Sequence, residues 1–156
     1  MRPKHFTLSG VKAAGNASLR LRYADGQRFD MDLAALIERH PTLARLRDRK
    51  VFATAKVGEN GASVIWADDD DLELAADNLR ARAVEQAGGV SHDFIWSWMA
   101  RHGLTLDTAA DALGVSRRML AYYRSVTKPV PRTVALACLG WENARKAGAH
   151  VFALVA

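Results

Sequence analysis

The pattern of apolar residues changes once along the chain, near Leu72, and this change constrains the fold more than any other feature. Before it, segments such as residues 6–14 and 18–32 alternate apolar and polar side chains, as strands with one buried face do. After it, apolar residues recur at helical spacing. A chain of 156 residues has room for two small compact units. We therefore expect the α+β class, with an α+β unit of antiparallel strands followed by an all-α unit.

The first unit is expected to contain about five short strands and one or two helices. The turn sequences "GNA" and "ADGQ" predict a meander of about three strands, and "GENG" predicts a second hairpin. A helix is predicted at residues 33–40, before Pro41. The predicted boundaries are 1–74 for this unit, 75–90 for a connecting helix with a Gly-Gly hinge, and 91–156 for the helical unit.

Capping residues divide the second unit into short helices. Ser91, Thr105 and Ser116 are typical N-caps, and Gly103 and Gly114 are typical residues after a helix end. "VPRTVALACLG" has proline at a helix start, and "WENARKAG" predicts a separate last helix. The second and third helices of this unit therefore meet at a very short turn.

The helix predicted at 116–125 has two different faces. Met119, Leu120 and Tyr123 cluster on one side. The opposite side begins with Arg117 and Arg118 and continues with Ala121, Tyr122 and Ser125. Guanidinium groups can bind guanine edges in a major groove about 12 Å wide, and the small alanine allows close approach. Such a face suits DNA, although a helical corner with solvated arginines is the alternative.

The 45 residues from "WSWMARHG" through "LDTAADALGVSRRMLAYYR" to "ALACLG" resemble the phage-repressor-like (XRE-type, lambda-repressor-like) helix-turn-helix. The glycine usual after the recognition helix is absent from "YRSVTKP", and Leu106 stands where the family often has a glutamine. The resemblance implies a set of DNA-binding residues, with base contacts from the first three and backbone contacts from the rest: Arg117, Arg118, Tyr122, Ser116, Arg124 and Lys128.

The first half is similar to a small bacterial α+β domain of unknown function found in antitoxin-like proteins. The matching features are "ADG" followed by Phe29-Asp30, then Leu33 with Leu36, Phe52, and Trp66 followed by Asp71-Leu72. The resemblance implies a protein-interaction or accessory domain, in some members fused to a helix-turn-helix. It implies no catalytic residues.

Charge and composition narrow the function classes. The net charge is +5, with a balance of +1 over residues 1–80 and +4 over 81–156, and residues 114–132 contain no acidic residue. No apolar run is long enough to span a membrane, so we expect a cytoplasmic protein without a membrane partner. The single cysteine, Cys138, lies in an apolar run and is expected to be buried.

No metal, cofactor or enzyme activity is predicted. The run Asp68–Asp71 lacks the spacing of a calcium loop and is interpreted as a surface turn. The five histidines show no zinc-site spacing, and no nucleotide-binding or nucleophile motif is present. Trp96 and Met99, three residues apart, are expected to pack on other helices, with Trp98 pointing elsewhere. The apolar end "HVFALVA" is expected to pack on its own domain or on a second subunit.

These observations predict a sequence-specific DNA-binding protein, a bacterial transcriptional regulator whose helix 116–125 enters the major groove of double-stranded DNA. A homodimer is expected, because one short helix covers only a few base pairs. The alternative is an antitoxin-like interaction module that binds a toxin through its N-terminal domain, with or without autoregulatory DNA binding.

Overall fold

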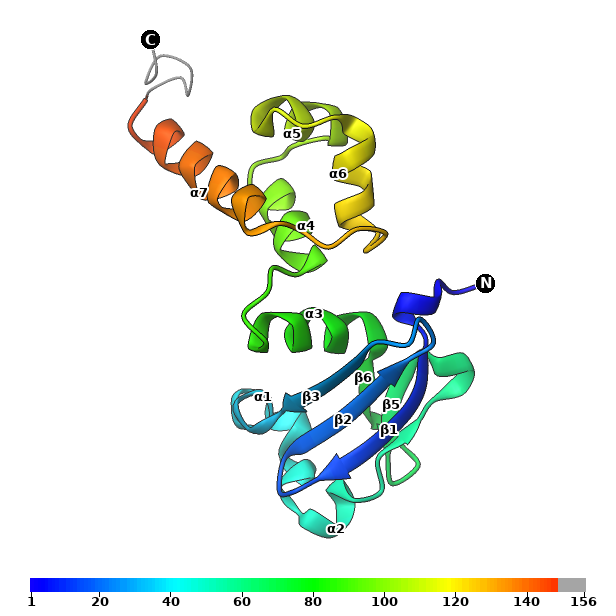
Figure 1. The fold of residues 1–156 in the computed structure, drawn as a ribbon. Coiled ribbons are helices and arrows are strands. Elements are labelled where there is room, and N and C mark those ends of the chain that lie inside the picture. The colour runs from blue at the N-terminus through cyan, green and yellow to red at the C-terminus, as the bar shows by residue number, and fades with distance from the viewer. Residues whose placement is uncertain (149–156) are drawn as a thin grey trace. The chain divides into compact units, whose positions relative to one another are not determined.

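The structure is a computed structural model that describes residues 1–148. It divides into two compact units, Met1–Ala87 and Gly88–Ala156. The first unit contains two three-stranded antiparallel sheets, in the orders β1-β2-β3 and β4-β5-β6 (Figure 1). Both the α+β class and the antiparallel strands are as predicted. No helix in residues 1–148 is long and apolar enough to cross a membrane. The predicted packing of residues 150–156 lies outside the described part of the chain.

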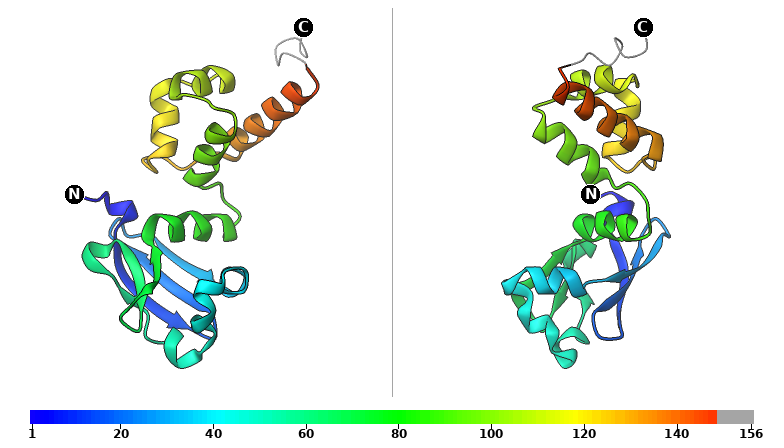
Figure 2. Two further views of the ribbon diagram at one scale, coloured as in Figure 1. Left: turned by 180° about the vertical axis from the view of Figure 1, so that it is seen from behind. Right: turned by 90° about the vertical axis from the view of Figure 1, so that its left-hand side faces the viewer.

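The first sheet is a meander of β1 (Leu8–Ala14), β2 (Ser18–Tyr23) and β3 (Arg28–Asp32). Its alternating residues divide cleanly between two faces. Leu19, Leu21 and Tyr23 are buried against the core, while Arg20 and Arg22 on the same strand face solvent. Figure 2 (right) shows this sheet along one side of the unit, with the second sheet, α1 and α2 on the other.

The second sheet consists of β4 (Lys56–Val57), β5 (Ser63–Trp66) and β6 (Asp69–Ala75). Short helical segments lie before it: η1 (Lys4–Phe6), α1 (Ala34–Arg39), η2 (Pro41–Arg47) and α2 (Arg49–Phe52), with η3 (Glu59–Gly61) between β4 and β5. Gly61 has φ +71°, and a Cβ built on it would lie 2.5 Å from the carbonyl oxygen of Leu8. Only glycine therefore allows this turn to lie against β1.

The acidic run Asp68–Asp71 is partly a turn and partly a strand. Ala67 and Asp68, with φ near +54° and +52°, form a two-residue hairpin turn, and Asp69 begins β6. Asp68 pairs with Lys56, and Asp69 pairs with Arg45. Within residues 1–148 there is no group of three metal-ligating side chains.

The helix that we expected to connect the two halves instead packs on the first unit. This helix, α3 (Ala76–Gln86), follows β6 directly, and Tyr23 Oη donates a 2.7 Å hydrogen bond to the carbonyl of Ala76. The Arg80 guanidinium is buried, lies 2.8 Å from Asp25, and stacks 4.9 Å from the Tyr23 ring centroid. Gln86 exchanges two hydrogen bonds with the backbone of Asp32. These contacts place the unit boundary after Ala87 rather than at residue 74.

The second unit contains α4 (His92–Arg101), α5 (Leu106–Leu113), α6 (Arg117–Arg124) and α7 (Arg132–Lys146). Its core is formed by residues from all four helices: Ile95, Trp98, Met99, Ala109, Ala110, Leu120, Tyr123, Val134 and Cys138. The two helices that we predicted at the end are one, because α7 continues through Gly140 without a break. Cys138 is fully buried, as predicted, and burial raises the pKa of its thiol to about 12.

Candidate nucleic-acid interface

The turn between α5 and α6 is fixed by local capping at three points. Thr105 and Thr108 form a reciprocal capping box at the start of α5. Gly114 ends α5 in the left-handed conformation, with φ +68° and ψ +29°, and the Val115 amide donates to the Ala110 carbonyl. The Ser116 hydroxyl accepts a 3.1 Å hydrogen bond from the Met119 amide. Ser116 is thus the N-cap of α6, as its sequence position predicted.

The angle between α5 and α6 is also set by packing of small residues. Ala109 and Ala110 of α5 are buried, as is Leu120 of α6. Alanines at a helix contact allow the two backbones to approach closely. Because Leu120 and Tyr123 of α6 are buried in the core, the opposite face of α6 is exposed, and it carries Arg117 and Arg118.

Tyr122 brings two of the predicted cations together. The Arg118 Nε donates a 2.6 Å hydrogen bond to the Tyr122 hydroxyl, and its guanidinium lies 5.4 Å from the Tyr122 ring centroid. The Lys128 ammonium lies 5.8 Å from the same ring. Arg118, Tyr122 and Lys128 therefore form one group at the exposed side of α6, which we call the Tyr122 cluster.

Arg117 has a carboxylate partner that lies outside the acid-free stretch. Its Nε lies 2.9 Å from an oxygen of Asp107 in the first turn of α5, and both side chains are more than two-thirds exposed. Exposed ion pairs of this kind contribute about 0 to 1 kcal/mol to stability. A phosphate or a guanine edge can therefore compete with Asp107 for Arg117 at little cost.

Arg124 is half-buried against Trp96 rather than free at the exposed side of α6. Its guanidinium stacks on the Trp96 ring, 3.4 Å from the centroid, and burial lowers its pKa below the usual value. The Trp96 Nε1 donates to the Arg124 carbonyl at 3.4 Å. Ser116, Arg117, Arg118, Tyr122 and Lys128 remain at the exposed side of the corner, so the structure separates Arg124 from the other predicted contacts.

The predicted placement of the tryptophans in α4 was wrong. Trp98 is fully buried, whereas Trp96 is 47% exposed. The buried stripe of α4 consists of Ile95, Trp98 and Met99 at i, i+3 and i+4, and it excludes position 96. Starting the helical pattern at Ile95 would have identified the buried face of α4 from the sequence.

Val126 occupies the position after α6 where the helix-turn-helix pattern favours glycine. It adopts φ +61°, a left-handed conformation that is rare for a β-branched residue. The Lys128 amide donates to the Tyr122 carbonyl at 3.2 Å, which closes the loop back onto α6. The chain thus turns after α6 without a glycine, at a cost in strain of about 1 to 3 kcal/mol.

A polar cluster that sequence reasoning missed joins α4 to α7. The Glu142 carboxylate lies 2.8 Å from His102 Nε2 and 2.8 Å from an Arg101 guanidinium nitrogen. These hydrogen bonds hold the pKa of Glu142 below its usual range, with the larger effect from His102 and the smaller from Arg101. Trp141 packs edge-on against both Trp98 and His102. The cluster stabilises the helical unit and lies on elements other than α6.

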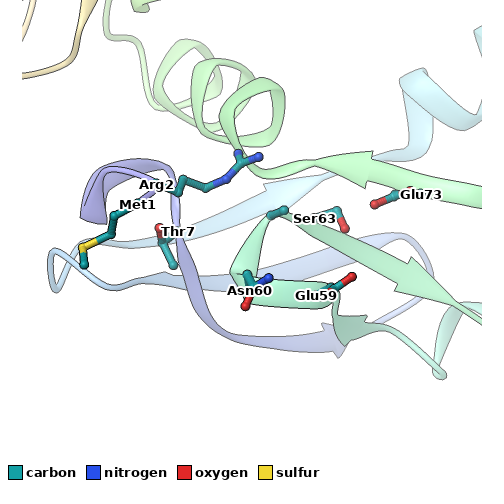
Figure 3. A pocket seen from close by; sticks show the side chains of 8 residues that line it. Met1, Arg2, Thr7, Glu59, Asn60, Ser63 and Glu73 are labelled. Atoms are coloured by element: carbon teal, nitrogen blue, oxygen red, sulfur yellow. The ribbon is translucent and has the colours of Figure 1, made fainter.

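A hollow of about 750 Å³ opens on the first unit (Figure 3). Its lining comes from the N-terminal segment, η3 and the second sheet: Met1, Arg2, Thr7, Glu59, Asn60, Ala62, Ser63 and Glu73. The lining mixes one basic side chain with two carboxylates and two hydroxyls. Its chemistry favours no particular ligand class.

Fold and surface together define a two-unit protein, in which an α+β domain precedes a helical unit with a basic exposed helix. The chain belongs to the family described as "Protein of unknown function (DUF2442)", which matches residues 8–85. This confirms the resemblance to a family of unknown function in the first half, and the matched range includes nearly all of α3. The match does not extend into the helical unit.

One solved structure resembles nearly the whole chain. It is the crystal structure of "Putative DNA Binding Protein NE0471" of Nitrosomonas europaea, which is 42% identical, with a TM-score of 0.82. The similarity covers 93% of this chain and 92% of that one. Among curated proteins, none matches the chain.

Proposed function

We propose that this chain is a sequence-specific DNA-binding protein, a bacterial transcriptional regulator that acts by binding rather than by catalysis. The observation that carries the proposal is the outward face of α6, where Arg117 and the Tyr122 cluster lie opposite the buried Leu120 and Tyr123, with Lys128 reaching the cluster from the following loop. In this proposal α5 and α6 are a helix-turn-helix of the phage-repressor type, and α6 enters the major groove. The name of the Nitrosomonas europaea protein is consistent with it.

The individual side chains take distinct roles in this proposal. Arg117 and Arg118 lie in the first turn of α6, where side chains of a recognition helix reach base edges. Lys128 and the hydroxyl of Ser116 contact phosphates. Arg124 braces α6 against α4 through Trp96, so its contribution to DNA binding is positional.

A homodimer in the cytoplasm completes the proposal, because a single short helix reads only a few base pairs and paired half-sites supply the remaining specificity. Lys128 is the one α6-surface cation assigned to phosphate in each subunit, so a dimer neutralises about two phosphates through it. These two contacts should contribute about −1.8 to the slope of the logarithm of the binding constant against the logarithm of salt concentration.

The test is fluorescence-anisotropy binding of the intact protein to the duplex upstream of its own coding region and to a scrambled duplex. We expect Arg117→Ala and Arg118→Ala each to cost about 1 to 3 kcal/mol on the native duplex and to relax its preference over the scrambled one. Lys128→Ala should weaken both duplexes equally, and Lys146→Ala, which removes an exposed cation at the end of α7, is the matched control.

Two results would overturn this proposal. The first is an equal loss on both duplexes for the arginine and lysine variants, which would remove the base-reading role of α6. The second is the absence of DNA binding by a folded protein that purifies with a small partner at fixed stoichiometry, which would favour the antitoxin-like function.

A further inference from the structure

Positive charge is concentrated on the outer face of the first sheet, although the first unit as a whole is nearly neutral. Four cationic side chains are exposed there: Lys12 on β1, Arg20 and Arg22 on β2, and Arg28 on β3. With Gly10, Val11 and Leu21 they line a hollow of about 250 Å³. We call these four side chains the basic sheet face.

The strand register places like charges directly opposite each other. Lys12 is the partner of Arg20 across β1 and β2, and Arg22 is the partner of Arg28 across β2 and β3. Side chains at such positions lie about 5 Å apart at Cβ, and like charges there destabilise the sheet. The fold alone gives no reason for two such pairs in neighbouring rows, so they indicate an anionic partner.

Two carboxylates lie on the same face, but Asp32 accepts a hydrogen bond from the Ala34 amide and, among the described residues, only Asp30 pairs with one of the four cations. Asp30 lies opposite Arg20 in the register and pairs with it at 3.0 Å, with both side chains well exposed. Within residues 1–148, no ion pair involves Lys12, Arg22 or Arg28. These three cations are therefore free to bind an external anion.

Gly10 shapes the face so that a large anion can approach. It lies opposite Arg22, and a Cβ built at Gly10 would come within 3.4 Å of the Arg22 guanidinium. Without a side chain at this position, Arg22 lies across β1 instead of being pushed away from the sheet. The guanidinium is thus held close to the surface, beside Lys12.

The chemistry of the face favours the sugar-phosphate backbone of duplex DNA. Guanidinium forks match phosphate oxygens, and three of the four cations are arginines. The aromatic residues of these strands, Tyr23 and Phe29, lie on the inner face and contact each other edge-on. The outer face therefore lacks the rings that stack unpaired bases and the aromatic anchors typical of protein interfaces.

We propose that the basic sheet face is a second DNA-binding surface, which holds the phosphate backbone without reading sequence. This inference rests on the proposed function for the identity of the polymer. It assigns to the DUF2442-matching unit a contribution to affinity, while the specificity belongs to α6.

The test uses the intact protein and a fluorescein-labelled random-sequence duplex. For each bound subunit, Arg22→Gln with Arg28→Gln should reduce the salt slope by about 1.8, because each phosphate contact contributes about 0.9. The loss of affinity should then be about twelvefold larger per bound subunit at 50 mM salt than at 200 mM salt. Arg39→Gln with Arg49→Gln is the matched control, since it makes the same charge change at two exposed positions on α1 and α2.

The native and scrambled duplexes separate this inference from the proposed function. The sheet variant should weaken both equally and keep the preference, whereas Arg117→Ala with Arg118→Ala should lose the preference and keep the sheet's part of the salt slope. If the sheet variant has the same duplex affinity and salt slope as its control, the inference about the basic sheet face is overturned and the proposed function is not. If Arg117→Ala with Arg118→Ala changes neither the affinity nor the preference, while the sheet variant still weakens DNA binding, only the proposed function is overturned.

An acidic protein partner is the remaining occupant to test. Labelled poly-L-glutamate is the probe, measured at the same salt concentrations. If the sheet variant loses poly-L-glutamate binding while its duplex binding stays equal to the control, the face takes acidic polypeptide and the DNA assignment is wrong. Loss of duplex binding with little change in poly-L-glutamate binding supports the inference.

Discussion

Replacing Gly114 by alanine should destabilise the helical unit by about 1 kcal/mol through backbone conformation alone. An L-residue in the left-handed region destabilises the folded state by about 1 to 2 kcal/mol. Alanine also lowers the conformational entropy of the unfolded chain relative to glycine, and this offsets part of the loss. A Cβ at Gly114 meets no atom within 4 Å, so no steric clash adds to the cost. Asparagine tolerates this conformation better, and Gly114→Asn should lose about half as much.

The assay is urea denaturation followed by tryptophan fluorescence, because three of the four tryptophans lie in the helical unit. Gly140→Ala is a control of opposite sign: Gly140 is helical, exposed and free of close neighbours, so alanine there should stabilise by about 0.5 to 1 kcal/mol. In thermal melts, each kcal/mol corresponds to a shift of about 4 to 8 °C for a unit of this size. Equal stability of Gly114→Ala and wild type would refute the argument.

Two further substitutions test the helical unit. Val126→Gly should stabilise it by about 0.5 to 1 kcal/mol, because it relieves the left-handed strain of a β-branched residue, and a lower urea midpoint would contradict this. Glu142→Gln should destabilise at pH 7, since it removes the carboxylate that His102 and Arg101 bind. Because the folded-state pKa of Glu142 is lowered, its contribution is present above about pH 4.3 and is lost as the pH falls through the folded value. A difference in urea midpoint that is unchanged at pH 3.5 would contradict this prediction.

The sequence predicts local structure well where one residue carries the signal. Ser91, Thr105 and Ser116 accept the hydrogen bonds expected of N-caps, and Gly114 takes the left-handed conformation. The alternation in β2 likewise gives the buried and exposed faces of the first sheet. In each case the cause lies within about four residues of the effect, so the pattern is visible in the sequence.

Features set by distant contacts could not be predicted in the same way. The turn at Ala67 and Asp68 lacks the glycine that marks a two-residue hairpin, and pairing between β5 and β6 imposes its positive φ angles. Helix α3 has the composition of a connecting helix, but Arg80 joins it to Asp25, 55 positions earlier in the sequence. Its membership of the first unit therefore depends on tertiary packing.

The candidate interface shows the same division. The exposed face of α6 followed from helical periodicity, whereas the partners of its cations did not. Asp107 lies on a different helix from Arg117, and Trp96 is 28 positions from Arg124. A stretch without acidic residues therefore overstated the number of free cations, since packing brings a carboxylate to one and an aromatic ring to another.

In the proposed function, the partner of Arg118 also affects how well Arg118 would read a base. Its hydrogen bond to the Tyr122 hydroxyl, which uses Nε, restricts a side chain that otherwise loses about 2 kcal/mol of rotamer entropy on ordering. The two terminal nitrogens of the guanidinium remain available for a bidentate contact. Tyr122 itself is anchored through α6, whose inner side is buried at Leu120 and Tyr123. If α6 binds DNA as proposed, part of the ordering cost is therefore met when the helical unit folds, and Tyr122 would contribute to affinity through Arg118 as well as through any contact of its own.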